Sequence, residues 1–148
     1  MSTKDLFEII RKDFIELPGK ISATTSADFV DRFKKLLDMA PARQHRGVVY
    51  VYLCERPIPR VRGNSNILYI GKTNQTMRER LMRWAKTEGS DYNCSRYQYI
   101  ISKEYGPITL GYARYNILAA TPKAAEKQLL KMYFAKHLEY PPLNRASS

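Results

Sequence analysis

Two tyrosines stand in the middle of two apolar runs, and their phenols could take part in acid–base chemistry. Tyr50 belongs to the run 48–53 and Tyr69 to the run 67–70. Both runs are rich in β-branched and aromatic residues, which is typical of β-strands. If the strands pair, side chains on one face approach within about 5–8 Å, so the two phenols could share one water. A nearby cation would lower a phenol pKa that is otherwise near 10. Because the chain has 11 tyrosines, two ordinary strand tyrosines are the alternative.

Cations follow the second run closely. Gly71 is expected to end the strand in a sharp turn, and Lys72 comes directly after it. Thr76 and Glu79 have the spacing of a capping box, which predicts that a helix begins there. Arg80 would lie on the first turns of that helix. A fixed guanidinium binds two phosphate oxygens at once, so Arg80 is a candidate phosphate ligand, and a solvated surface charge is the alternative.

One carboxylate stands among lysines on a later segment. Thr121 and Pro122 are typical of a helix start, and the predicted helix runs to 137 or 139. Glu126 is the only acidic residue from Pro107 to Leu138. Because Mg²⁺ and Mn²⁺ prefer oxygen ligands, Glu126 is a candidate metal ligand. The alternative is an acid that only stabilises the N-terminus of its helix.

Five short segments occur in a fixed order between residues 47 and 144. They are Val49-Tyr50, Leu68-Tyr69-Ile70-Gly71-Lys72-Thr73, Arg80-Leu81, Ala125-Glu126 and Pro142-Leu143-Asn144. This series resembles the markers of the GIY-YIG nuclease superfamily. Each segment alone is a common short sequence, whereas the ordered series is much rarer. The resemblance covers about two thirds of the chain.

The resemblance implies a metal-dependent endonuclease that hydrolyses phosphodiester bonds in nucleic acid, with DNA favoured over RNA. It implies that Tyr50 is the general base and that Tyr69 orients the water. Arg80 would bind the scissile phosphate, and Arg78 is a rival for that role. Glu126 would hold Mg²⁺ or Mn²⁺.

Lys72 and Asn144 have supporting roles by the same resemblance. Lys72 would aid phosphate binding, and Asn144 would support the site by hydrogen bonding. The chain departs from the family pattern at Val48, where the family has glycine, and at Trp84, where a histidine or tyrosine is frequent. These departures keep a second hypothesis open, a catalytically silent module of the same fold that binds nucleic acid.

The charge of the chain points to a polyanionic partner. The formal net charge is +11, and residues 47–148 contribute most of it, with sixteen Lys or Arg against seven Asp or Glu. An excess of this kind around a glycine turn favours a phosphate-binding surface, and double-stranded DNA is the expected partner. The alternative is a basic surface that only aids solubility. The candidate nucleic-acid-binding residues are Arg56, Arg60, Arg62, Arg78, Arg83 and Trp84.

The connector between the two predicted strands is unusually long. It spans residues 55–66 and contains prolines, a glycine and three of the arginines named above. Loops longer than the usual two to five residues of a hairpin are often functional. The connector is therefore predicted to be a phosphate-contacting loop, with a flexible surface excursion as the equal alternative.

The elements that would position these residues make an α+β domain. The predicted order is helices at 3–16 and 27–39, strands at 48–53 and 67–70, a helix from 76, a short helix at 91–103, a strand at 108–117 and the long C-terminal helix. We expect a small three-stranded antiparallel sheet flanked by helices (residues 47–148), with an N-terminal two-helix extension (residues 1–46) packed on it. The extension could instead form an arm for DNA contact or a homodimer.

The composition excludes several other classes. No apolar run approaches the roughly 20 residues that cross a membrane, and the N-terminus lacks the features of a signal peptide. We therefore expect a cytoplasmic or nucleoid-associated protein. Two cysteines and two histidines at these spacings do not predict a zinc site.

Overall fold

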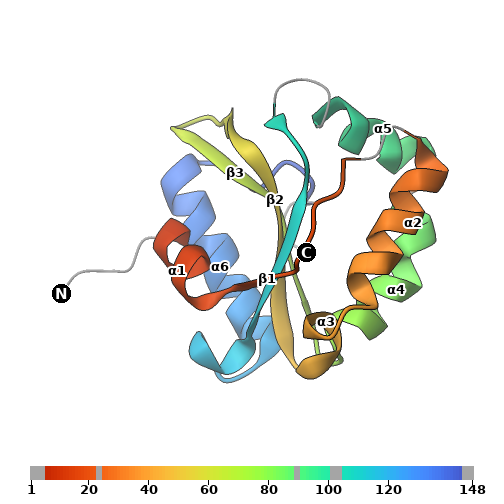
Figure 1. The fold of residues 1–148 in the computed structure, drawn as a ribbon. Helices are drawn as coiled ribbons and strands as arrows, with labels where there is room; N and C mark the ends of the chain where they lie inside the picture. Colours follow the sequence, from red (N-terminus) through yellow and green to blue (C-terminus); the bar gives the residue numbers. More distant parts are fainter. Residues whose placement is uncertain (1–5, 23–24, 89–90, 101–104, 145–148) are drawn as a thin grey trace.

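A four-stranded antiparallel sheet runs through the middle of the protein in the computed structural model, which describes residues 6–22, 25–88, 91–100 and 105–144 (Figure 1). Across the sheet the strands are ordered β1 (Ile15–Glu16), β4 (Thr109–Arg114), β2 (Val48–Pro59) and β3 (Asn64–Thr73). The α+β class is therefore as predicted.

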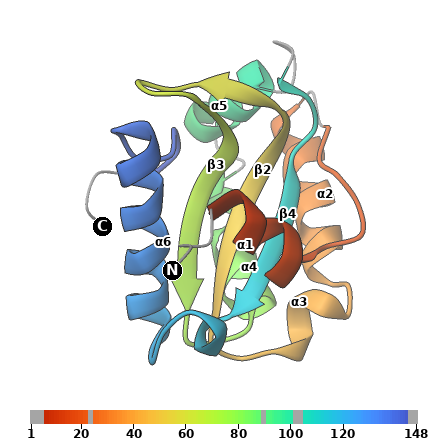
Figure 2. The same cartoon turned by 90° about the vertical axis from the view of Figure 1, so that its left-hand side faces the viewer.

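Helices cover both faces of the sheet. One face carries α1 (Leu6–Asp13) and α6 (Pro122–His137) (Figures 1 and 2). The other carries α2 (Ser26–Leu37), α3 (Pro41–Gln44), α4 (Met77–Glu88) and α5 (Asp91–Ile100), and a short 3₁₀ helix (Tyr115–Ile117) follows β4. None of the described helices is long and apolar enough to cross a bilayer.

Strand β2 is buried on both faces because it is central and covered on each side. Its side chains alternate, so Val49, Val51 and Leu53 join the core cluster under α1 and α6. Tyr50 and Tyr52 join the cluster under α2, α4 and α5. A strand buried on both faces must be apolar throughout rather than alternating, which is the pattern of residues 48–54.

The sheet has four strands rather than the three that the sequence predicts, because residues beyond the first helix form an extra edge strand. The spacing of apolar residues predicts one helix over 3–16, but α1 ends at Asp13. Ile15 then pairs with Tyr112 of β4, and the Leu17 amide donates to the Leu110 carbonyl at 2.8 Å. Residues 15–17 are extended because their backbone groups pair with the edge of β4, even though the spacing of apolar residues favours a helix.

The two N-terminal helices lie on opposite faces of the sheet. The apolar face of α1 packs in the cluster with α6, while Phe29, Phe33 and Leu37 of α2 pack beneath the other face. Helix α2 begins one residue earlier than expected, because the Thr25 hydroxyl accepts from the Asp28 amide at 3.2 Å. The apolar faces of both helices are thus buried within the chain itself.

The prediction of a long loop at residues 55–66 is wrong. Strand β2 continues to Pro59 and β3 begins at Asn64, so only a four-residue turn remains. The Arg60 amide donates to the Gly63 carbonyl at 2.9 Å, and Gly63 has a φ of +71° that glycine adopts without strain. Prolines in this stretch suggest a loop, but β2 has no β4 partner beyond Leu53, and an edge tolerates a missing amide donor.

The turn of this hairpin is fastened to the C-terminal end of α6. Arg62 donates through Nε to the Lys136 carbonyl at 2.8 Å and through Nη2 to the Ala135 carbonyl. Arg60 donates to the Tyr140 carbonyl at 2.7 Å and pairs with Glu139 at 2.6 Å. Cations at a helix C-terminus are stabilising, so these two candidate nucleic-acid contacts already serve the fold.

This arrangement predicts a difference in stability between two arginines of one hairpin. The Arg60 side chain is only 10% exposed and makes an ion pair, so Arg60→Ala should lower the free energy of unfolding by about 2 kcal/mol. The exposed Arg56 is the matched control, and Arg56→Ala should change it by less than about 0.5 kcal/mol. Urea denaturation measures both, and equal losses would contradict the fastening role.

Candidate active site

Tyr50 and Tyr69 lie on the same face of the sheet with their ring centroids 6.1 Å apart. The register places Tyr52 opposite Tyr69, at a ring distance of 5.2 Å, and Gly71 opposite Tyr50. Tyr52 was not among the predicted site residues, although its spacing of two residues from Tyr50 puts both side chains on one face of β2. The two candidate phenols are therefore members of a packed tyrosine cluster.

Gly71 leaves the space through which the Tyr50 side chain passes. A Cβ atom at Gly71 would lie 2.5 Å from Cζ and 2.7 Å from the hydroxyl oxygen of Tyr50. The phenol therefore crosses β3 at this glycine, and its hydroxyl ends beside the backbone that leads into Lys72. The expected turn at Gly71 is wrong, because β3 continues to Thr73. The glycine instead allows the Tyr50 ring to approach the backbone of β3 closely.

The close approach predicts that Gly71→Ala displaces Tyr50. The added methyl cannot fit, so we expect a loss of about 1–3 kcal/mol in unfolding free energy and an altered Tyr50 environment in the NMR spectrum. Gly111→Ala on β4 is the matched control, since its Cβ would meet no atom closer than 3.5 Å. A Gly71→Ala protein as stable as the control, with unshifted Tyr50 resonances, would contradict this geometry.

A cationic hollow of about 340 Å³ lies where β3 ends and α4 begins. Lys72, Thr73, Asn74, Gln75, Arg80 and Arg83 line it. It thus gathers two predicted phosphate ligands and one predicted nucleic-acid contact, whereas neither tyrosine nor Glu126 lines it. Three cations around one hollow are suited to bind an anion such as phosphate.

The N-terminus of α4 fixes the place of Arg80. The predicted capping interaction is present, because the Glu79 amide donates to the Thr76 hydroxyl at 3.0 Å. The Glu79 carboxylate accepts from the Thr76 hydroxyl at 3.3 Å and from Arg46 at 3.0 Å. Both contacts hold the first turn of the helix, so Arg80 projects from a rigid element.

Glu126 lies beside the hollow on a third element. Helix α6 begins with Thr121 as its cap, whose hydroxyl accepts from the Ala124 amide at 3.1 Å, and it lies along the outer side of β3 (Figure 2). Burial raises the pKa of the half-buried Glu126 carboxyl, and the charges of Lys72, Arg80 and Lys123 partly offset that rise. The packing of α6 on β3 thus places Glu126 where the charges of Lys72 on β3 and Arg80 on α4 act on it.

The raised pKa has a consequence for stability. The folded state disfavours ionised Glu126, so this charge destabilises the protein above the raised pKa, and the effect disappears as the pH falls below the ordinary value of 4.5. Glu126→Gln should therefore melt at or above the wild-type temperature at pH 7, with the difference shrinking towards pH 4.5. Calorimetry across this range measures it, and a variant that is less stable at pH 7 would assign Glu126 to the fold instead.

Asn144 binds the outer edge of β3. Its side-chain oxygen accepts from the Ile70 amide at 2.8 Å, and its amide donates to the Ile70 carbonyl at 2.9 Å. The Leu143 amide also donates to the Leu68 carbonyl at 2.9 Å. The segment thus occupies backbone groups of Leu68 and Ile70 on the outer edge of β3, which holds the strand in register.

The remaining predicted residues are not gathered at the hollow. Arg78 pairs at 2.9 Å with Asp38, the C-cap residue of α2, and the hairpin arginines lie near the far end of β3. The side chain of Trp84 lies outside the described residues. No three His, Cys, Asp or Glu side chains within the described ranges come together as a metal-binding group, so a metal here would depend on Glu126.

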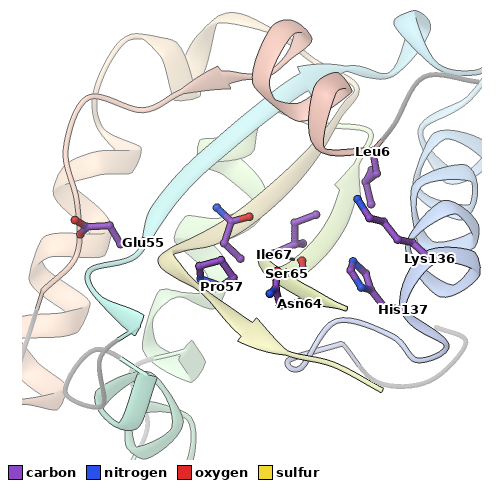
Figure 3. Close-up of a pocket in the computed structure, with 9 residues that line it drawn as sticks. Leu6, Glu55, Pro57, Asn64, Ser65, Ile67, Lys136 and His137 are labelled. Carbon is purple, nitrogen blue, oxygen red and sulfur yellow. Dashed lines mark hydrogen bonds between the residues drawn. The ribbon is translucent and has the colours of Figure 1, made fainter. Parts of the chain in front are cut away.

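A second pocket of about 420 Å³ lies near the hairpin end of the sheet (Figure 3). Its lining comes from α1, β2, β3 and α6 and includes Leu6, Ser65 and His137. His137 is 3% exposed, with Nδ1 2.9 Å from the Arg62 carbonyl and its ring 4.5 Å from that of Tyr133. The histidine therefore serves the packing of α6 against the hairpin.

No protein-family model matches the chain, and searches of curated proteins and of solved structures found no match.

Proposed function

We propose that the protein is a metal-dependent endonuclease of the GIY-YIG type that hydrolyses phosphodiester bonds in double-stranded DNA. One observation carries the proposal: Lys72 of β3 and Arg80 of α4 line one cationic hollow, and both charges act on the Glu126 carboxyl of α6. Because Gly71 has no side chain, the Tyr50 hydroxyl lies against the backbone of Gly71, the residue that precedes Lys72. Phosphate ligands, a carboxylate and a candidate base are thus within one small region.

Arg80 and Lys72 would hold the scissile phosphate. Both face the same hollow, where a guanidinium can bind two phosphoryl oxygens and an ammonium adds a further charge. Their positive charge would stabilise the additional negative charge of the transition state. Fixed cations in this place need no reorganisation during the reaction.

Tyr50 would act as the general base. Its side chain is 2% exposed, and electrostatic effects are stronger in such a site than in water. Burial opposes a phenolate, so this role requires the cations of the hollow to offset that cost. Tyr50 would then take a proton from the water that attacks the phosphorus. Tyr69 would orient that water, since its ring packs 6.1 Å from that of Tyr50.

Glu126 is the residue that would hold Mg²⁺ or Mn²⁺. Its carboxylate is a hard oxygen ligand. The nearby positive charges only partly offset the cost of burying the ionised carboxylate, so a metal ion could stabilise it further. The positive charges of Lys72, Arg80 and Lys123 oppose the binding of a metal ion unless a phosphate supplies negative charge. We therefore expect the metal to bind together with the substrate. When bound, it supplies a Lewis acid for the phosphoryl oxygens.

A catalytically silent module that binds nucleic acid is the second candidate. The nearly complete burial of Tyr50 favours it, because a base must reach its water. This module would bind DNA through the cationic hollow, with an affinity that falls steeply with salt, and would release no cleaved product.

Plasmid and oligonucleotide cleavage tests the proposal. With Mg²⁺, the wild type should cut DNA, and EDTA should abolish cutting. Arg80→Ala and Glu126→Gln should each lower the rate by on the order of 10²–10³-fold, as expected when a group that stabilises the transition state is removed.

Arg11→Ala is the control, because this exposed arginine of α1 belongs neither to the proposed site nor to the candidate nucleic-acid contacts. It should cleave at the wild-type rate. Cutting that persists in both site variants, or that needs no metal, would refute the assignment, and salt-sensitive binding without cutting would support the silent module.

A further inference from the structure

Helix α6 carries a row of three exposed lysines. Lys123, Lys127 and Lys131 recur every four residues, so they follow one side of the helix. Figure 2 shows α6 running along the outer side of β3 for most of the height of the molecule. We call these three residues the lysine row.

The lysine row works against the stability of its own helix. Like charges four residues apart repel each other, and Lys123 lies in the first turn, where the helix dipole disfavours a cation. Among the described residues, none of the three lysines forms a salt bridge, and only Lys123 has an opposite charge acting on it, that of Glu126. The packing of α6 does not explain why these positions are cationic.

The row begins at the proposed active site. Lys123 acts on the Glu126 carboxyl together with Lys72 and Arg80, so the first lysine belongs to the same electrostatic environment as the hollow. The other two lysines continue from there towards the hairpin end of the sheet. The row therefore starts near the hollow and runs along α6 towards its C-terminal end, which contacts the hairpin through Arg62.

We propose that the lysine row binds the sugar-phosphate backbone of the DNA strand that leads away from the cleavage site. This inference rests on the proposed function and adds the path of the substrate to it. Eight residues of helix span about 12 Å, which matches three to four nucleotides at about 3.4 Å of duplex axis each. Contacts of this kind position the duplex without reading its sequence.

The salt dependence of binding tests the row. We would replace the three lysines together (K123Q/K127Q/K131Q) and measure the affinity for a short fluorescent duplex in EDTA, from about 50 to 200 mM salt. Each phosphate contact contributes about 0.9 to the slope of log affinity against log salt, so the slope should become shallower by about 2.7. Loss of the repulsion should also raise the melting temperature by about 2 °C.

A variant with the same loss of charge provides the control. Lys12, Lys34 and Lys35 are exposed on α1 and α2, and K12Q/K34Q/K35Q lowers the net charge equally. This control should keep a slope within about 1 of the wild-type slope, since one contact is worth about 0.9. Equal changes of slope in both triple variants would show a general charge effect and would overturn the inference.

Cleavage assays separate this inference from the proposed function. Wild-type protein that binds DNA with a slope dependent on the lysine row but does not cut it would support the row and refute the nuclease. A triple variant that binds and cuts as the wild type does would overturn the row and leave the nuclease intact.

Discussion

The close contact between the Tyr50 phenol and the Gly71 backbone is the constraint on which the rest of the site depends. It requires that β2 and β3 pair in one register, with no side chain at Gly71. A slip of one residue would move Tyr50 to the opposite face of the sheet. Asn144 binds the backbone of Ile70 next to this contact, and the Arg60 and Arg62 interactions with α6 hold the other end of the hairpin. The β2–β3 hairpin is thus held in place both near Gly71 and at its turn.

Charge in this region is arranged at a cost to stability. Glu126 is half-buried and its pKa is raised, and lysines on the same helix repel one another. At the hairpin end the charged groups favour the fold, as where Arg60 pairs with Glu139. Unfavourable charge gathered beside a hollow is typical of sites that bind a charged ligand. The contrast between the two ends of β3 therefore agrees with a functional end near Lys72 and a structural end at the hairpin.

Local sequence signals predicted the parts of the fold that local interactions decide. The Thr76 and Thr121 caps, the apolar β2 and the long α6 all follow from short patterns. The strand at Ile15, the tight hairpin around Gly63 and the structural use of Arg60 and Arg62 depend on residues distant in sequence, so composition and periodicity could not predict them. Gly71 shows the same limit within the candidate site. A glycine after an apolar run indicates that the backbone needs a residue without a side chain, but it does not distinguish a turn from a close approach by another side chain.

Anomalous scattering from Mn²⁺ in crystals of the protein with a short DNA duplex tests the central claim most directly. We expect an ion within about 2.1 Å of a Glu126 carboxylate oxygen, bound together with a phosphate that contacts Arg80 and Lys72. Crystals without DNA should show much weaker occupancy, since the surrounding cations oppose the metal. An ion bound away from Glu126, or a phosphate that avoids the cationic hollow, would contradict the account.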